Sequence, residues 1–286
     1  MTAALALLLV AAPTPFAPDF DSIVVERVAT GYQFTEGAVW TPKGTLVFSD
    51  IPANKIYEWK PGSEPTVLHD PSGNANGNLI GRNGKLISCL HGGRSVVSWN
   101  GKGKSVDLAT KFDGKQLNSP NDVAYGPQKS LYFTDPPYGI NPKDSAIGFA
   151  GVYRITGSGK VTLQEKGMNR PNGIAFSADM SMAYVSDTAN RNIMKFSVDR
   201  KGDFYDGKEF AKLPYPDGMR VDSEGNVYCT ANGGVHVFSP SGEKLGLIKV
   251  PENPTNCAFG ENGMKTLFIT AQKSVYKCAV PIRGKA

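Results

Sequence analysis

Short apolar runs alternate with polar turn residues along most of the chain, in a unit that recurs six times. In each unit an oxygen-bearing side chain precedes one apolar run, and a second apolar run starts about ten residues later. The residues at this key position are Glu36, Asn76, Asn121, Asn172, Asp217 and Asn256. A repeat of about 40–50 residues that holds several short strands is typical of propeller blades.

The segments within each unit support the same interpretation. Residues 46–48 and 131–133 are examples of the second run, and Gly-containing turns such as residues 42–44 precede it. A third run follows about twenty residues after the key position, except in the third unit, where residues 152–155 come later. β-branched and aromatic residues dominate these runs, as they do in strands. The sequence therefore predicts an all-β fold, a six-bladed β-propeller with four-stranded antiparallel blades.

The first 20 residues follow a different pattern. An apolar run from Ala3 to Ala12 is followed by three prolines, which resembles the hydrophobic region of an export leader, although no Lys or Arg precedes Arg27. We predict an export leader or a disordered N-terminus at residues 1–20 and the propeller at residues 21–286. A leader predicts a periplasmic or secreted protein, and its absence a cytoplasmic one. Residues 21–30 are predicted to form a strand that completes the sixth blade and closes the ring.

Composition and charge exclude some classes of function. The 286 residues include 32 Gly and 20 Pro, which suits many tight turns, and the net charge is +5. The basic residues are scattered, so no nucleic-acid partner is expected, and no apolar run approaches the ~20 residues that span a bilayer. The four Cys lack metal-site spacing and are expected to be buried free thiols, with one disulfide possible after export. The oligomeric state is not predicted.

The key residues are predicted to meet around one axis, because the first strand of each propeller blade lines the central channel. Buried polar groups need partners, and Ca²⁺ takes six to eight oxygen ligands from carboxylates, amides and water. One Glu and one Asp would neutralise a divalent ion. We expect Ca²⁺, with Mg²⁺, Mn²⁺ or Zn²⁺ as alternatives, although the lack of His and Cys at key positions disfavours zinc. Taken singly, an Asn-Gly or Asp-Gly pair is more often a turn than a ligand.

Several motifs resemble the gluconolactonase, regucalcin (senescence marker protein) and luciferin-regenerating enzyme family over about residues 22–280. They include residues 35–37 (TEG), 118–122 (NSPND), 170–173 (RPNG) and 216–219 (PDGM), and residues 133–139 (FTDPPYG) resemble the gluconolactonase branch in particular. The resemblance implies a six-bladed propeller with a divalent cation, usually calcium, on Glu36, Asn121, Asn172 and Asp217. Asn76 and Asn256 then line the channel as candidate substrate contacts. Ser119 stands where the regucalcin branch has a substrate-gripping arginine, which argues against transferring that branch's sugar specificity.

The loops after the second strands are predicted to lie on the same face as the cation. The longest, within residues 136–149, would overhang the site, as loops that set specificity often do. Tyr138 and His91, which belong to these loops, are candidate substrate contacts; alternatively, Tyr138 packs on its prolines and His91 caps a turn. Asp122 is expected to orient its neighbour Asn121.

Together these features predict a calcium-dependent hydrolase that opens a sugar lactone or a related small ester. The cation would polarise the carbonyl group, and Asp217 would act as both ligand and general base. No Gly-x-Ser-x-Gly motif is present and none of the three His is at a key position, which disfavours a Ser-His-Asp hydrolase. Two alternatives stay open: a non-catalytic, calcium-stabilised binding propeller, and a phosphotriesterase-type calcium propeller.

Overall fold

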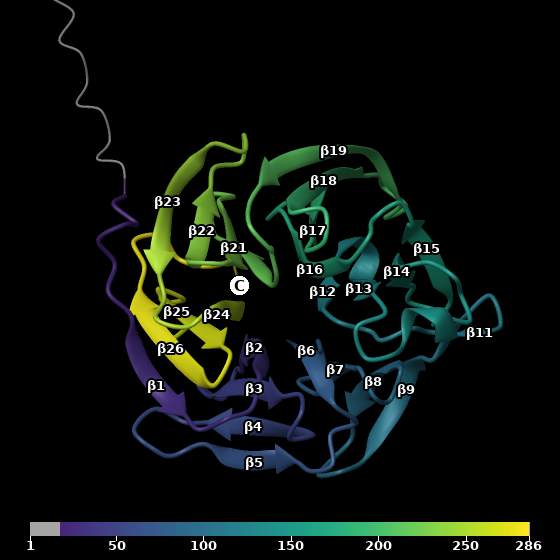
Figure 1. The fold of residues 1–286 in the computed structure, drawn as a ribbon, viewed down its shortest axis with the longest axis horizontal. Helices are drawn as coiled ribbons and strands as arrows, with labels where there is room; N and C mark the ends of the chain where they lie inside the picture. The colour runs from purple at the N-terminus through teal and green to yellow at the C-terminus, as the bar shows by residue number, and fades with distance from the viewer. Residues whose placement is uncertain (1–17, 286) are drawn as a thin grey trace, which may run out of the picture.

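Six four-stranded antiparallel sheets surround a central channel in the computed structural model, which describes residues 18–285 (Figure 1). Each sheet is one blade, so the predicted six-bladed β-propeller is confirmed. Within the described residues the helical segments are two 3-10 turns, η1 (Pro127–Lys129) and η2 (Pro142–Asp144). The predicted leader, residues 1–20, lies almost entirely outside the described residues and stays a prediction.

The strands of each blade follow one another from the channel outward. Blades one to three contain β2 (Thr35–Trp40), β3 (Leu46–Asp50), β4 (Lys55–Trp59) and β5 (Thr66–His69); β6 (Ala75–Ile80), β7 (Leu86–Leu90), β8 (Ser95–Trp99) and β9 (Ser105–Ala109); and β12 (Val123–Tyr125), β13 (Leu131–Asp135), β14 (Gly151–Ile155) and β15 (Val161–Glu165). Blades four and five contain β16 (Pro171–Phe176), β17 (Met182–Asp187), β18 (Asn192–Val198) and β19 (Phe204–Lys212); and β20 (Met219–Val221), β21 (Val227–Ala231), β22 (Gly234–Phe238) and β23 (Lys244–Lys249). A small hairpin, β10 (Lys111–Phe112) and β11 (Lys115–Gln116), separates blades two and three.

Blade six is built from both ends of the described chain. Its order is β24 (Pro254–Gly260), β25 (Thr266–Ala271), β26 (Ser274–Ala279) and β1 (Glu26–Thr30), and β1 pairs antiparallel with β26. The predicted closure of the ring is therefore correct, but the strand begins at Glu26 rather than at residue 21. Ile23 and Val25 pack instead on the apolar cluster between blades five and six, so their hydrophobicity reflects packing rather than strand pairing.

The core lies between the blades rather than in one central mass. Each of the six apolar clusters in residues 18–285 joins two neighbouring blades. Trp40 of blade one, for example, stacks on Phe268 of blade six with ring centroids 5.1 Å apart. All four cysteines are buried and free. Among the described residues, no helix has the length and apolar character needed to cross a membrane.

Candidate functional site

A cavity of about 350 Å³ opens at the end of the channel where the inner strands begin, which we call the polar end. Its lining includes seven of the predicted site residues: Glu36, Asn76, His91, Asn121, Tyr138, Asn172 and Asp217. Phe34, Ile51 and Pro52 add an apolar side to the rim. The structure thus brings together residues from blades one to five, whereas Asn256 and Asp122 lie outside the lining.

The glycine that follows four key residues permits close approach between neighbouring blades. A Cβ atom at Gly37, Gly77, Gly173 or Gly218 would overlap the key residue of the next blade, at Asn76, Asn121, Asp217 or Asn256 respectively. Only Gly37 of these four has a positive φ, of +58°. The Asn-Gly and Asp-Gly pairs are therefore not ordinary turns here; they let the inner strands crowd around the axis.

β-Bulges follow or flank the key residues of several inner strands. The register shifts lie between Glu36 and Val39 in blade one, between Ala75 and Asn78 in blade two and between Pro171 and Ile174 in blade four. In blade six the shift comes before the key residue, between Pro254 and Asn256. In a regular strand, residues three apart point to opposite faces. A bulge changes that phase, and both Glu36 and Val39 line the channel as a result.

Three aspartates at the ends of second strands hold the segments that carry the candidate ligands. Each aspartate accepts hydrogen bonds from the backbone N–H groups of two residues, which precede a key residue by three and two positions in the sequence. The bonds run from Gln33 and Phe34 to Asp50, from Asn118 and Ser119 to Asp135, and from Asn169 and Arg170 to Asp187, at 2.7–3.0 Å. This places the loops after those second strands on the same face as Glu36, Asn121 and Asn172, as predicted.

The hydroxyl residue just before each of these aspartates reaches the next blade along the ring. Ser49, Thr134 and Ser186 donate to the backbone carbonyls of Asn76, Asn172 and Asp217, at 2.6–2.8 Å. The key positions are therefore fixed to one another by hydrogen bonds between blades as well as by packing.

Glu36 has one carboxylate oxygen occupied and one available. Its Oε2 accepts from the backbone N–H of Gly37 at 2.8 Å and from the Asn256 amide at 3.2 Å. The Asn256 Oδ1 accepts from the Cys257 N–H, which fixes its NH₂ group toward Glu36. Asn256 was predicted to contact the substrate. In the structure its side chain instead supports Glu36 and does not line the cavity.

Asn172 is oriented by Thr188, a residue that sequence reasoning missed. The Thr188 hydroxyl donates its single proton to the carbonyl of Pro216 at 2.7 Å, so it must accept from Asn172, whose Nδ2 lies 3.0 Å away. The Asn172 Oδ1 is therefore directed away from Thr188. An amide held this way presents oxygen rather than nitrogen to a cation.

Asp217 carries the least compensated charge of the site. Its Oδ1 is buried and has no hydrogen-bond partner in the described part of the chain. Burial raises the pKa of Asp217 well above its usual range, and the carboxylates of Glu36 and Asp122 raise it further. Burial likewise raises the pKa of Glu36 to about 7. Both groups would therefore gain from a nearby positive charge, which favours the charged form of a carboxyl group.

Asp122 occupies the position that is glycine in blades one, two, four and five. Its carboxylate accepts from the N–H groups of Val123 at 2.9 Å and Ile174 at 3.3 Å, and Arg220 Nη1 lies 3.9 Å from its Oδ2. The predicted orientation of the Asn121 side chain is not what these contacts show, because the Asp122 carboxylate reaches toward blade four and Arg220. Arg220 lies beside Asp122, so the carboxyl groups of the cavity lining are Glu36 and Asp217, whose two charges when ionised would match a divalent cation.

His91 and Tyr138 present polar groups to the cavity. His91 Nε2 lies 2.9 Å from the Asn76 amide, and burial lowers the pKa of His91 to about 4, so its imidazole is neutral at pH 7. Arg170 lies over the Tyr138 ring, 5.3 Å from its centroid. The Tyr138 hydroxyl and the Asn76 Oδ1 are both buried without a partner among residues 18–285, and each suits a ligand hydrogen bond.

The long loop of blade three is fastened at several points. Ser119 Oγ accepts from the Gly139 N–H at 2.9 Å, and the Asn118 amide donates to the Phe149 carbonyl at 2.8 Å. Ser145 donates to Asn118 Oδ1 at 2.6 Å. Ser119, singled out in the sequence for the arginine it replaces, thus anchors the loop that carries Tyr138 to the cavity wall.

Residues 34–273 match the family profile described as "SMP-30/Gluconolactonase/LRE-like region". A gluconolactonase of Zymomonas mobilis is 36% identical, with 92% of this chain and 85% of that protein covered. The pentonolactonase XacC of Haloferax volcanii is 29% identical, with 86% and 84% covered.

Solved structures of a gluconolactonase and of a luciferin-regenerating enzyme also align with this chain. A gluconolactonase of Xanthomonas campestris aligns with a TM-score of 0.86 at 31% identity, covering 93% of this chain and 92% of that one. A luciferin-regenerating enzyme aligns with a TM-score of 0.81 at 20% identity, covering 93% and 98%; at that identity the likeness concerns the fold alone.

Proposed function

This chain belongs to the SMP-30/gluconolactonase/LRE-like family, and we propose that it is a lactonase that opens a sugar lactone or related small ester with the help of Ca²⁺. The observation that carries the proposal is the pair of buried carboxyl groups with raised pKa values, Glu36 and Asp217, in the lining of one cavity. The gluconolactonase and pentonolactonase named above support the lactone as substrate class.

Four side chains would hold the cation: Glu36, Asn121, Asn172 and Asp217. The orphaned Asp217 Oδ1 and the fixed amide orientation of Asn172 fit such an ion. An all-oxygen donor set with two carboxylates suits calcium, whose remaining ligands are water and substrate. When bound, the cation supplies Lewis-acid polarisation of the lactone carbonyl. Mg²⁺, Mn²⁺ and Zn²⁺ are the alternatives that metal analysis would distinguish.

Asp217 is the proposed base. As a water oxygen adds to the lactone carbonyl carbon, the Asp217 carboxylate accepts a proton from that water. As the bond between the carbonyl carbon and the ring oxygen breaks, Asp217 returns that proton to the ring oxygen, and the product is a hydroxy acid. A carboxylate that also holds a cation is a weak base, which suffices for an activated ester such as a lactone.

The substrate would be held by groups around the base. Tyr138 and the Asn76–His91 pair offer hydrogen bonds to substrate oxygens. Phe34, Ile51 and Pro52 shield the opposite rim. The cavity of about 350 Å³ is near the small end of the range for ligand pockets, which fits a monocyclic lactone.

A pH-stat assay over a panel of aldonolactones tests the proposal. We expect hydrolysis that EDTA abolishes, that Ca²⁺ restores and that Asp217→Asn reduces by about 10³-fold or more. Asp206→Asn, a matched change at an exposed carboxylate, should leave the rate unchanged. Lactone opening that ignores EDTA would contradict the metal dependence.

The same assay separates the other two candidates. Calcium-dependent thermal stability without turnover of any lactone would indicate a binding propeller. Hydrolysis of phosphotriesters that exceeds hydrolysis of lactones would indicate a phosphotriesterase.

A further inference from the structure

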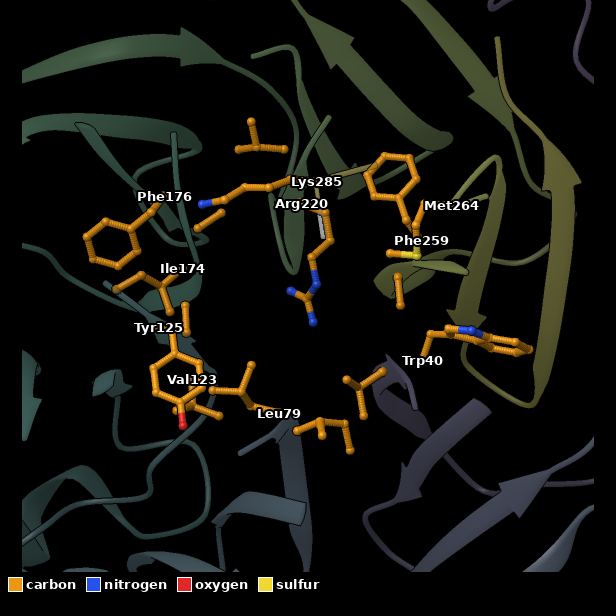
Figure 2. Close-up of a pocket in the computed structure, with 16 residues that line it drawn as sticks. Trp40, Leu79, Val123, Tyr125, Ile174, Phe176, Arg220, Phe259, Met264 and Lys285 are labelled. Carbon is orange, nitrogen blue, oxygen red and sulfur yellow. The ribbon is translucent and has the colours of Figure 1, made fainter. Parts of the chain in front are cut away.

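A second cavity, of about 270 Å³, lies at the opposite end of the channel, which we call the apolar end (Figure 2). It shares no lining residue with the cavity at the polar end. The residue three positions after the key residue lines it in every blade. These residues are Val39, Leu79, Ala124, Ala175, Arg220 and Phe259. Five blades therefore contribute an apolar side chain at this level, and blade five alone contributes a charge.

Arg220 extends from β20 into the middle of this cavity (Figure 2). Its guanidinium donates to two backbone carbonyls, Met219 at 2.7 Å and Ala38 at 3.2 Å. Its carboxylate partner, Asp122, lies at 3.9 Å, beyond hydrogen-bond distance. A guanidinium has five N–H donors, so Arg220 has donors left and a loosely paired charge. Its side chain retains 21% of its exposure, while that of Asp122 retains 1%, so the guanidinium is the accessible member of the pair.

The surroundings of Arg220 are apolar and cationic. Val39, Leu79, Val123 and Ile174 supply aliphatic surface, and no acidic residue occurs in the lining of this cavity within residues 18–285. Lys285 adds a second positive charge at the rim, where its Nζ donates to the carbonyl of Ser177 at 2.9 Å. The complementary ligand carries a negative charge at one end and an apolar body behind it.

We propose that the cavity at the apolar end binds a small monocarboxylate with an aliphatic or aromatic body, with its carboxylate on Arg220. The planar guanidinium matches a carboxylate through two parallel hydrogen bonds. The body lies against Val39, Leu79 and Ile174. A volume below the usual range for drug-sized ligands limits the body to a short chain or one ring. This binding function is additional to the proposed lactonase activity and does not depend on it.

Isothermal titration calorimetry with hexanoate and benzoate tests the proposal on the full chain. The matched neutral probes are hexanamide and benzamide, which keep the body and remove the charge. EDTA is present throughout, so that the carboxylates cannot bind a cation at the polar end. We expect dissociation constants of about 1 mM or lower for the acids and binding about tenfold or more weaker for the amides. No saturable binding of the acids, or equal binding of acids and amides, would overturn the proposal.

Substitutions in the two cavities test whether hexanoate binds at Arg220. Arg220→Met should weaken hexanoate binding by about tenfold or more, and Arg82→Met, an exposed arginine that stacks on Tyr125 of the same lining, should not. Asp217→Asn should retain hexanoate binding, because it lies at the polar end. Binding that survives Arg220→Met or disappears in Asp217→Asn would refute the assignment. Should Arg220→Met fail to fold, the double variant with Asp122→Asn removes the unpaired carboxylate and allows the same measurement.

Discussion

The two ends of the channel are built from the same six strands and have opposite chemistry. At the polar end, Glu36 and Asp217 bring together two buried carboxyl groups whose pKa values are raised by burial. At the apolar end, three residues further along each strand, aliphatic side chains surround one arginine. The Asp122–Arg220 contact lies between them. One repeat therefore supplies two rings, and each ring takes its chemistry from the residues in which the blades differ.

The two ends of the channel also differ in the groups that lie beside their buried carboxylates. Asp122 replaces the glycine of four other blades and lies beside Arg220, whereas Glu36 and Asp217 raise each other's need for a positive charge and are the carboxylates that we propose to hold a cation. The polar end should therefore respond to metal and pH, and the apolar end to loss of its internal partner.

Removing the metal should make stability depend on pH. The pKa of Glu36 is raised from 4.5 to about 7, so between about pH 4.5 and 7 the folded chain keeps a proton that the unfolded chain releases. The free energy of unfolding should therefore fall as pH rises through this window, on the order of 3 kcal/mol from Glu36, with Asp217 acting in the same direction. Urea unfolding in EDTA at several pH values measures this. Saturating Ca²⁺ should remove the slope, and a flat profile in EDTA would contradict the interpretation.

Glu36→Gln should have opposite effects with and without metal. Loss of one of two carboxylates should weaken Ca²⁺ binding by about 100-fold or more, while the metal-free protein above pH 7 becomes more stable because one buried charge is gone. Calorimetric Ca²⁺ titration and melting in EDTA measure the two effects. Glu224→Gln, in a turn of blade five, is the matched control. A lower melting temperature of Glu36→Gln in EDTA would argue against charge repulsion at the polar end.

Arg220→Met should destabilise the apolar end through Asp122. The change leaves a buried carboxylate without its cation, which should cost about 2 kcal/mol, less than for a fully buried ion pair because Arg220 is partly exposed. Adding Asp122→Asn should recover most of that loss. Chemical denaturation of the two single variants and the double variant measures the coupling. Additive losses would show that the two residues do not interact.

Thr188→Val should weaken the metal site without removing a ligand. The change frees the Asn172 amide and leaves the Pro216 carbonyl unpaired, so Ca²⁺ affinity should fall about tenfold. Thr188→Ser keeps the hydroxyl and should restore most of the affinity. Equal affinities of the Val and Ser variants would mean that the hydroxyl does not set the amide orientation.

The sequence predicts the fold and the meeting of the key residues at the polar end, because both follow from the regular spacing of the six repeats. Glu36 and Asp217 are far apart in the chain and lie in blades one and five, on either side of blade six, but their equal phase places both in the lining of one cavity. The Asx-Gly pairs, in contrast, have the composition of turns, and only coordinates reveal that the glycines face neighbouring blades.

The spacing of the repeats does not determine the direction in which each side chain points. Asn256 and Asn172 occupy equivalent positions, yet one amide donates to Glu36 and the other is turned by Thr188. The three hydroxyl–Asp pairs that end β3, β13 and β17 were a visible signal of the supports around the site. Arg220 was visible too, as a charge at a phase where other blades are apolar.

The closure of blade six sets the order in which this molecule can be completed. β1 pairs with β26, and Thr30 bonds to Lys273 across 243 residues of sequence. Contacts of such long range form slowly, and during synthesis they must wait for β26 to emerge. Glu36 is held by Asn256 of this last blade, so a ribosome-bound chain can fold its early blades, but the hydrogen bond that orients Glu36 forms only at the final step.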